Sequence, residues 1–106
     1  MPKYLLEVSY SVDAIRGVVA KGGSARKTAA QAAVKSVGGK LESFYFAFGG
    51  TDAYVVVDVP DNEAAAAVAL TVAAAGTGNI RTVVLLSPQE IDAALEKKVK
   101  YSPPGS

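Results

Sequence analysis

Five polar side chains lie within apolar segments of this sequence and could do chemistry: the carboxylates of Glu7 and Asp58, the phenols of Tyr45 and Tyr54, and the guanidinium of Arg81. A carboxylate whose pKa is raised by desolvation or by a neighbouring carboxylate acts as a general base or anchors a ligand. The tyrosine hydroxyls would orient a small aromatic or carbonyl ligand. The guanidinium would pair with one of the carboxylates or hold a ligand carboxylate.

Each member of this group also has a structural interpretation. A carboxylate on a strand can form an ion pair between subunits or stay solvated at the mouth of a barrel, and exposed pairs contribute little energy. Tyrosines on a sheet commonly pack across strands or across a dimer interface. Arg81 lies near a strand start and fits a solvated position. Two carboxylates would also attract a hard cation, but their spacing matches no metal-binding loop, so we predict no metal site.

The residue types that are missing exclude several classes of site. The 106 residues include no cysteine and no histidine. Disulfides, thiolate ligands, cysteine nucleophiles, Ser-His-Asp triads and the usual zinc and haem ligands are therefore excluded, and we predict no cofactor. The net charge is +1, from 11 Lys and Arg against 10 Asp and Glu. Without a basic patch interleaved with aromatic residues, we predict no nucleic-acid partner.

Length and hydropathy predict one soluble domain. A chain of 106 residues suits one domain with its own core. The most apolar run, Ala64–Ala75, is too short and too rich in alanine to cross a bilayer, and the first residues lack a signal-peptide pattern. We expect a cytoplasmic location without a membrane partner, a single domain over residues 1–100 and a flexible tail over residues 101–106.

Changes of hydrophobic period divide the chain into strands and helices. The expected strands are Lys3–Ser11, Lys40–Phe48, Ala53–Val59 and Ile80–Leu86. The expected helices run from Val12 to the Gly22-Gly23 pair, over Ala25–Val37 and Asn62–Ala75, and from Ser87 to about Lys98. This βαββαβ order with a C-terminal helix is typical of a ferredoxin-like α+β sandwich, in which helices cover one face of an antiparallel sheet.

Two short motifs predict where the chain turns. Gly49 and Gly50 are expected to supply positive φ in a tight hairpin, with Asp52 capping the turn through its own side chain. Ser87 to Glu90 has the sequence of a capping box, with proline in the first helical position.

The helix expected over Ala25–Val37 is rich in alanine. Ser24 is expected to cap it, with Arg26 off its apolar stripe. That stripe is Ala25, Ala29, Ala32, Ala33 and Val37. Gly22-Gly23-Ser24 and Arg26 could also hold an anion. They match no phosphate-loop spacing, so a plain helix start is the preferred interpretation.

Alternation along the strands predicts two unlike faces of the sheet. The set expected under the helices is Leu6, Val8, Phe44, Phe46, Phe48, Val55 and Val57. The set expected to stay open is Leu5, Glu7, Ser9, Ser43, Tyr45, Tyr54, Val56 and Asp58. This open set is too apolar for water and too polar for a dry core, so we expect a second subunit to pack on it and enclose a cavity. The fourth strand could place either Arg81, Val83 and Leu85 or Thr82, Val84 and Leu86 on this face.

Two segments resemble the GYD-domain proteins, small bacterial and archaeal proteins without an assigned activity: GGSARKTAAQAAVKSVGGKLESFYFAFGGTDAYVVVDVPD and IRTVVLLSPQEID. The resemblance extends from about Tyr4 to Ile91. The Gly-Tyr-Asp motif that names the family corresponds to Gly50, Thr51 and Asp52, so threonine replaces its tyrosine. If that tyrosine serves a ligand site, this chain has lost or altered it.

The GYD family is grouped with the dimeric α/β-barrel proteins, so the resemblance implies a dimer that pairs its sheets. That superfamily includes cofactor-independent monooxygenases, isomerases, haem enzymes and ligand-sensing domains, and the fold does not select among them. Our first hypothesis is a small-molecule-binding homodimer or larger homo-oligomer, with or without cofactor-independent catalysis. The alternative is a non-enzymatic assembly or regulatory module, in which the uncharged Ala64–Ala75 helix and the open face of the sheet both serve oligomer contacts.

Overall fold

A computed structural model describes residues 1–105; Ser106, the last residue of the predicted tail, lies outside the described residues. The strands are β1 (Lys3–Tyr10), β2 (Lys40–Phe46), β3 (Ala53–Asp58) and β4 (Gly78–Leu85). The helices are α1 (Val12–Lys21), α2 (Gly23–Ser36), α3 (Asn62–Ala74) and α4 (Pro88–Leu95).

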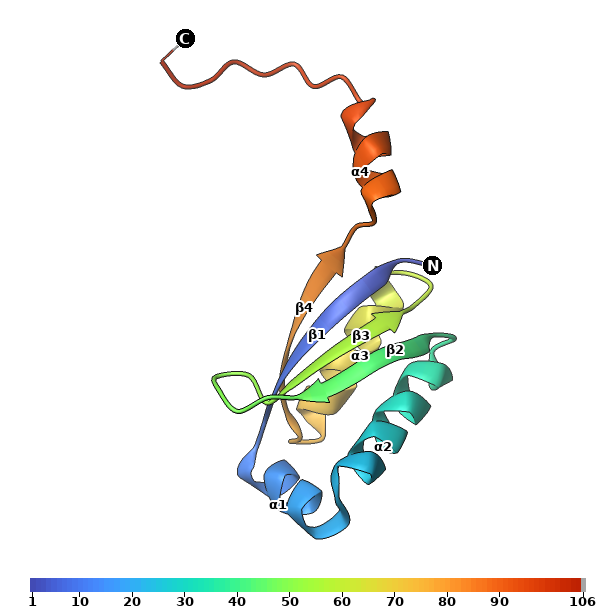
Figure 1. Cartoon of the computed structure of the whole chain (residues 1–106), viewed down its shortest axis with the longest axis vertical. Coiled ribbons are helices and arrows are strands. Elements are labelled where there is room, and N and C mark those ends of the chain that lie inside the picture. The colour runs from blue at the N-terminus through green and yellow to red at the C-terminus, as the bar shows by residue number, and fades with distance from the viewer. Residues whose placement is uncertain (106) are drawn as a thin grey trace.

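The strands form one antiparallel sheet in the order β2-β3-β1-β4. The connection from β1 to β2 contains α1 and α2, and the connection from β3 to β4 contains α3. Helices α2 and α3 pack on the same face of the sheet (Figure 1). The short helix α1 turns the chain between the end of β1 and the start of α2. This arrangement confirms the predicted ferredoxin-like α+β fold.

The core lies between the two inner strands and the two packed helices. From the sheet it takes Tyr4, Leu6, Val8, Ala53, Val55, Val57 and Val59, and from the helices Val34 and Ala65. Small alanines on the helices let the backbone approach the bulkier strand side chains closely. Phe44 packs against this core and makes an edge-to-face contact with Phe46, with 5.0 Å between ring centroids. Phe48 was predicted to belong to this set but is fully exposed, because β2 ends at Phe46.

The inward face of α2 differs from the predicted stripe by a rotation of the helix. Val34 is buried, and Ala30, Ala33 and Val37 are half-buried beside it, whereas Ala25, Ala29 and Ala32 are exposed. Arg26 precedes Ala30, Ala33 and Val34 by four, seven and eight residues, so it lies on the same inward face of the helix, and it is half-buried. The predicted Ser24 cap is also wrong. The helix begins two residues earlier than expected, at Gly23; its N-cap is Gly22, and no side chain caps it.

The predicted starts of the other helices follow local hydrogen bonds. Ser11 and Asp61 accept bonds from the amides of Ala14 and Ala64 and cap α1 and α3. The capping box of α4 is confirmed: the Ser87 amide donates to Glu90 Oε1 at 2.9 Å and the Glu90 amide to Ser87 Oγ at 3.1 Å. The first of these bonds lowers the pKa of Glu90.

The C-terminal helix lies apart from the sandwich. It ends at Leu95 rather than Lys98, and every residue from Pro88 to Gly105 is exposed. Figure 1 shows α4 beyond the end of β4, with the following chain extended away from the sheet. The Cα radius of gyration is accordingly 16.9 Å, against about 13 Å for a compact domain of this length. Among residues 1–105, no helix has the length and hydropathy needed to cross a bilayer.

The row that joins Val57, Tyr4 and Val84 across three strands gives a matched test of this core. Val57 is 1% exposed and Val84 is 59% exposed on the same face. We expect Val57→Ala to lower the free energy of unfolding by about 2 kcal/mol and Val84→Ala by less than about 0.5 kcal/mol. Urea denaturation measures both values, and equal losses would contradict the assigned core.

Candidate functional site

The register of the strands gathers four of the five candidate side chains into one row. Tyr45 lies opposite Tyr54, Tyr54 opposite Glu7, and Glu7 opposite Arg81. Residues opposite each other in antiparallel strands point to the same face and lie about 5 Å apart. The row therefore crosses all four strands on the face opposite α2 and α3. We call it the polar row.

The pairing of β1 with β4 decides which side chains of β4 share this face. Leu5 lies opposite Val83 and Lys3 opposite Leu85, so Arg81, Val83 and Leu85 point to the open face. Thr82 and Val84 lie opposite Leu6 and Tyr4 and therefore point to the helix side. The open face presents an apolar row, Ser43-Val56-Leu5-Val83, next to the polar row.

The side chains of the polar row remain accessible. Tyr45 is 71% exposed and Tyr54 is 40% exposed, while Glu7 is half-buried between its neighbours. Within residues 1–105, the oxygens of Glu7 and the nitrogens of Arg81 do not approach within 4.0 Å of each other. A carboxylate, a guanidinium and two phenols thus lie on one face, available to a molecule that covers it.

Asp58 lies apart from the polar row. Asp58 lies opposite Lys3 on β1. Lys3 and Glu7 point to the same face but are separated by roughly 14 Å along the strand. Lys3 Nζ donates to Asp58 at 2.9 Å and also contacts the carboxylate of Glu42. The bond to Glu42, followed by that to Asp58, raises the pKa of Lys3. Because Glu7 and Asp58 are so far apart, their mutual repulsion does not operate within one subunit.

The hairpin between β2 and β3 is fastened to the end of β1. The carboxylate of Asp52 accepts a hydrogen bond from the Tyr10 amide at 2.8 Å, and the Asp52 amide donates to the Val8 carbonyl at 2.8 Å. Ser9 Oγ donates to the Gly50 carbonyl at 3.3 Å. The side chain of Asp52 therefore holds a neighbouring strand, while its carbonyl closes the hairpin by accepting the Ala47 amide at 2.9 Å. The expected positive φ is also absent at Gly49 and Gly50, because this six-residue connection is wider than a tight hairpin turn.

The family model of the GYD domain, which describes the sequences of that family, matches residues 4–95 of this chain. The chain belongs to the GYD domain family. No curated protein and no solved structure matches it significantly.

In this GYD protein Gly50 and Asp52 connect the hairpin to the end of β1. The Gly50 carbonyl and the Asp52 carboxylate both accept hydrogen bonds from β1. Thr51, the residue between them in the sequence, is half-buried. These contacts align β1 with the hairpin, and β1 supplies Glu7 to the polar row.

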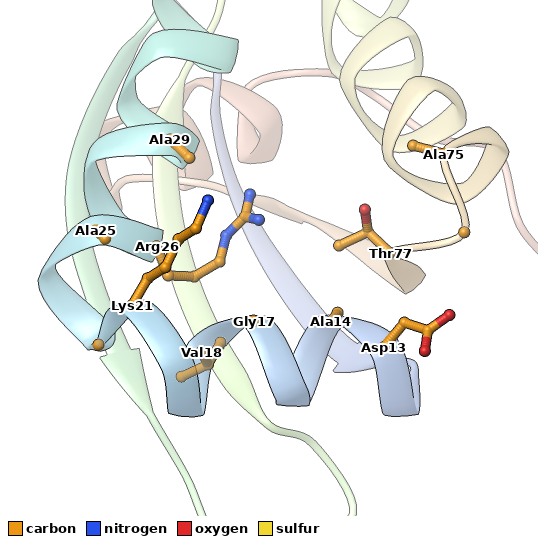
Figure 2. A pocket seen from close by; sticks show the side chains of 12 residues that line it. Asp13, Ala14, Gly17, Val18, Lys21, Ala25, Arg26, Ala29, Ala75 and Thr77 are labelled. Carbon is orange, nitrogen blue, oxygen red and sulfur yellow. The ribbon is translucent and has the colours of Figure 1, made fainter.

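A cavity of this GYD protein lies on the other side of the sheet. It measures about 530 Å³, is open to solvent, and is bordered by α1, the first turns of α2 and the turn after α3 (Figure 2). Arg26 lines it, as does Lys21, a residue that sequence patterns did not single out. A lysine in the last turn of a helix is ordinarily explained by the helix dipole, so spacing alone carries no signal for this cavity.

The contacts of Asp52 predict a measurable loss of stability when its carboxylate is removed. Asp52→Ala leaves the Tyr10 amide without its acceptor and should lower the free energy of unfolding by about 1–3 kcal/mol. Asp52→Asn keeps an oxygen acceptor and should lose less. The exposed Asp92 on α4 supplies the control Asp92→Ala, which should change stability by less than about 0.5 kcal/mol. Equal values for Asp52→Ala and Asp92→Ala in urea denaturation would contradict the fastening role.

Proposed function

We propose that this GYD protein is a cytoplasmic homodimer that binds a small molecule between the open faces of two sheets. The observation that carries the proposal is the polar row, which aligns Tyr54, Glu7 and Arg81 across a face that no helix or strand among residues 1–105 covers. Beside this row, the half-buried Leu5 and Val56 and the 39% exposed Val83 form an apolar surface that favours contact with a second copy.

The chemistry of the polar row suits a small aromatic or carbonyl compound. In a closed dimer, water is excluded and hydrogen bonds from Arg81 and the phenols strengthen. Arg81 would hold a carboxylate or polarise a carbonyl oxygen, the tyrosine rings would cover a flat ligand, and Glu7 would accept a proton next to that carbonyl. These roles need no group beyond the side chains of the row. Asp58 and its partner Lys3 lie at the edge of the same face, where they would line the entrance.

A second candidate function is a non-enzymatic assembly module. The observation that favours it is the exposed apolar side of α4, where Ile91 is 45% and Leu95 is 74% exposed. The outer side of α3 adds Leu70 and Ala73, which are exposed and have no charged neighbour on that helix after Glu63. Uncharged helix surfaces of this kind favour contacts between subunits beyond a dimer.

Neighbouring residues on opposite faces of β4 test the dimer. The protein should be a dimer by light scattering at micromolar concentration. Val83→Lys places a charge on the open face and should give monomers, because an unpaired interfacial charge costs several kcal/mol. Val84→Lys places the same charge on the helix side and should leave the dimer intact.

Other outcomes of the same measurement separate the two candidate functions. A monomeric wild-type protein would refute the dimer. Assemblies larger than a dimer that dissociate on Ala73→Glu, but withstand Val83→Lys, would favour the assembly module over the ligand-binding dimer.

Ligand binding is tested by thermal shift against a library of aromatic and carbonyl metabolites. At least one compound should raise the melting temperature, and Glu7→Gln and Arg81→Gln should each weaken its binding about tenfold through loss of a charge-assisted hydrogen bond. Glu63→Gln, the same substitution on α3, is the matched control and should leave binding unchanged. If no compound shifts the melting temperature of a confirmed dimer, the ligand-binding function is wrong.

A further inference from the structure

The cavity among the helices is separate from the polar row and has a composition of its own. Its walls are mostly small residues, among them Gly17, Ala25, Ala29 and Ala75. Its polar side chains come from two sides: Lys21 and Arg26 from the junction of α1 with α2, and Asp13 and Thr77 from the opposite side (Figure 2). A volume of about 530 Å³ lies within the ordinary range for small-molecule sites.

Arg26 is the unusual residue of this cavity, because it stands on the inward face of α2 in line with Ala30 and Val34. A guanidinium keeps its charge at every physiological pH, and placing a charge among apolar side chains costs free energy unless an anion accompanies it. Among residues 1–105, no carboxylate lies within 4.0 Å of Arg26. The described part of the chain therefore supplies no carboxylate partner for this half-buried residue.

Lys21 brings a second positive charge to the same cavity. It is the last residue of α1, and the Gly22 turn leads from it into α2, so both cations border one opening. Figure 2 shows the two side chains extending from the same side of the cavity toward its interior. Lys21, like Arg26, has no carboxylate within 4.0 Å among the described residues. Two unpaired cations that line one cavity repel each other, and an anion between them would relieve that repulsion.

Two residues of the cavity wall also border an apolar region. Arg26 and Thr77 also line a smaller hollow of about 40 Å³ between the helices and the sheet, whose other walls include Val68, Val72 and Ile80. Tyr10 lines this hollow too. Burial raises the pKa of its hydroxyl, an effect that the charge of Arg26 partly offsets, so the hydroxyl keeps its proton and remains a donor.

We propose that this cavity binds a small organic carboxylate. Its carboxylate would accept hydrogen bonds from Arg26 and Lys21, and its apolar group would lie against the alanine and valine side chains behind them. Arg26 offers the planar pair of donors that a carboxylate accepts. Asp13 on the far side repels a second negative charge, which favours a monoanion with an apolar body over a phosphate ester.

The proposal is independent of the polar row and is tested on the full chain. Benzoate, titrated while amide chemical shifts are followed, should shift residues around the cavity, including Gly17, Gly22 and Thr77. Benzyl alcohol has the same ring without the charge and should bind at least about tenfold more weakly, because charge-assisted hydrogen bonds are lost. Inorganic phosphate should also bind more weakly than benzoate, since it lacks the apolar group.

Substitutions can test separately whether binding depends on the two positive charges and on the empty volume of the cavity. Arg26→Gln and Lys21→Gln should each raise the dissociation constant for benzoate about tenfold. Lys27→Gln, on the same helix as Arg26 but exposed and outside the cavity, is the matched control and should leave it unchanged. Ala29→Phe keeps both cations but fills the cavity and should abolish binding, with circular dichroism confirming the fold.

Three results would overturn the proposal. Benzoate could leave the cavity amides unshifted up to its solubility limit, phosphate could bind as tightly as benzoate, or Lys27→Gln could weaken binding as much as Arg26→Gln. None of these results would affect the dimer or the polar row. Loss of the proposed dimer through Val83→Lys would in turn leave benzoate binding intact, so the two sites can fail separately.

Discussion

The pairing of β1 and β3 at the centre of the sheet is the interaction on which the rest of the structure depends. Both strands alternate strictly, and their register places Tyr4 with Val57, Leu6 with Val55, and Val8 with Ala53. All six side chains are buried under the helices. Because a shift of one residue would send every one of them to the other face, this register is held by the full burial energy of the core. The positions of Glu7 and Tyr54 on the open face follow from it.

The two sides of the sheet consequently present different chemistry to small molecules. On the open face, the row is flat, lies across strands and needs a second subunit to become a closed site. Among the helices, a cavity already exists within one chain because α1, α2 and the turn after α3 carry alanine or glycine where larger residues would fill the space. Arg26 lies at the boundary between this cavity and the core.

Much of the fold follows from sequence patterns, and the exceptions have physical causes. Strand and helix positions follow from hydrophobic period, and the open face of β1 and β3 from alternation. The inward face of α2 cannot be predicted in this way, because alanine is tolerated both in the core and on the surface. Val34 is the one large apolar residue of the helix that marks its buried side. For β4, Arg81, Val83 and Leu85 are as mixed in polarity as Thr82, Val84 and Leu86, so only the register with β1 decides. The role of Asp52 could not be predicted either, since its acceptor contact joins residues 42 positions apart. The sequence predicts the polar row only in part: it marks the four residues as candidates, but it does not show that they lie opposite one another.

The strand order also determines how the chain can fold during synthesis. The first strand made, β1, lies between β3 and β4, so neither of its neighbours exists when it leaves the ribosome. Its pairing with β4 joins Lys3 to Leu85 and closes nearly the whole length of the domain. Pairing between strands so far apart in the sequence is slow, and the apolar edges of the strands stay exposed until it forms. The hairpin of β2 and β3 is local and can form first, so it offers β1 a template before β4 is complete. The hydrogen bonds that Ser9 and Tyr10 donate to Gly50 and Asp52 then act at the step where the earliest strand meets that template.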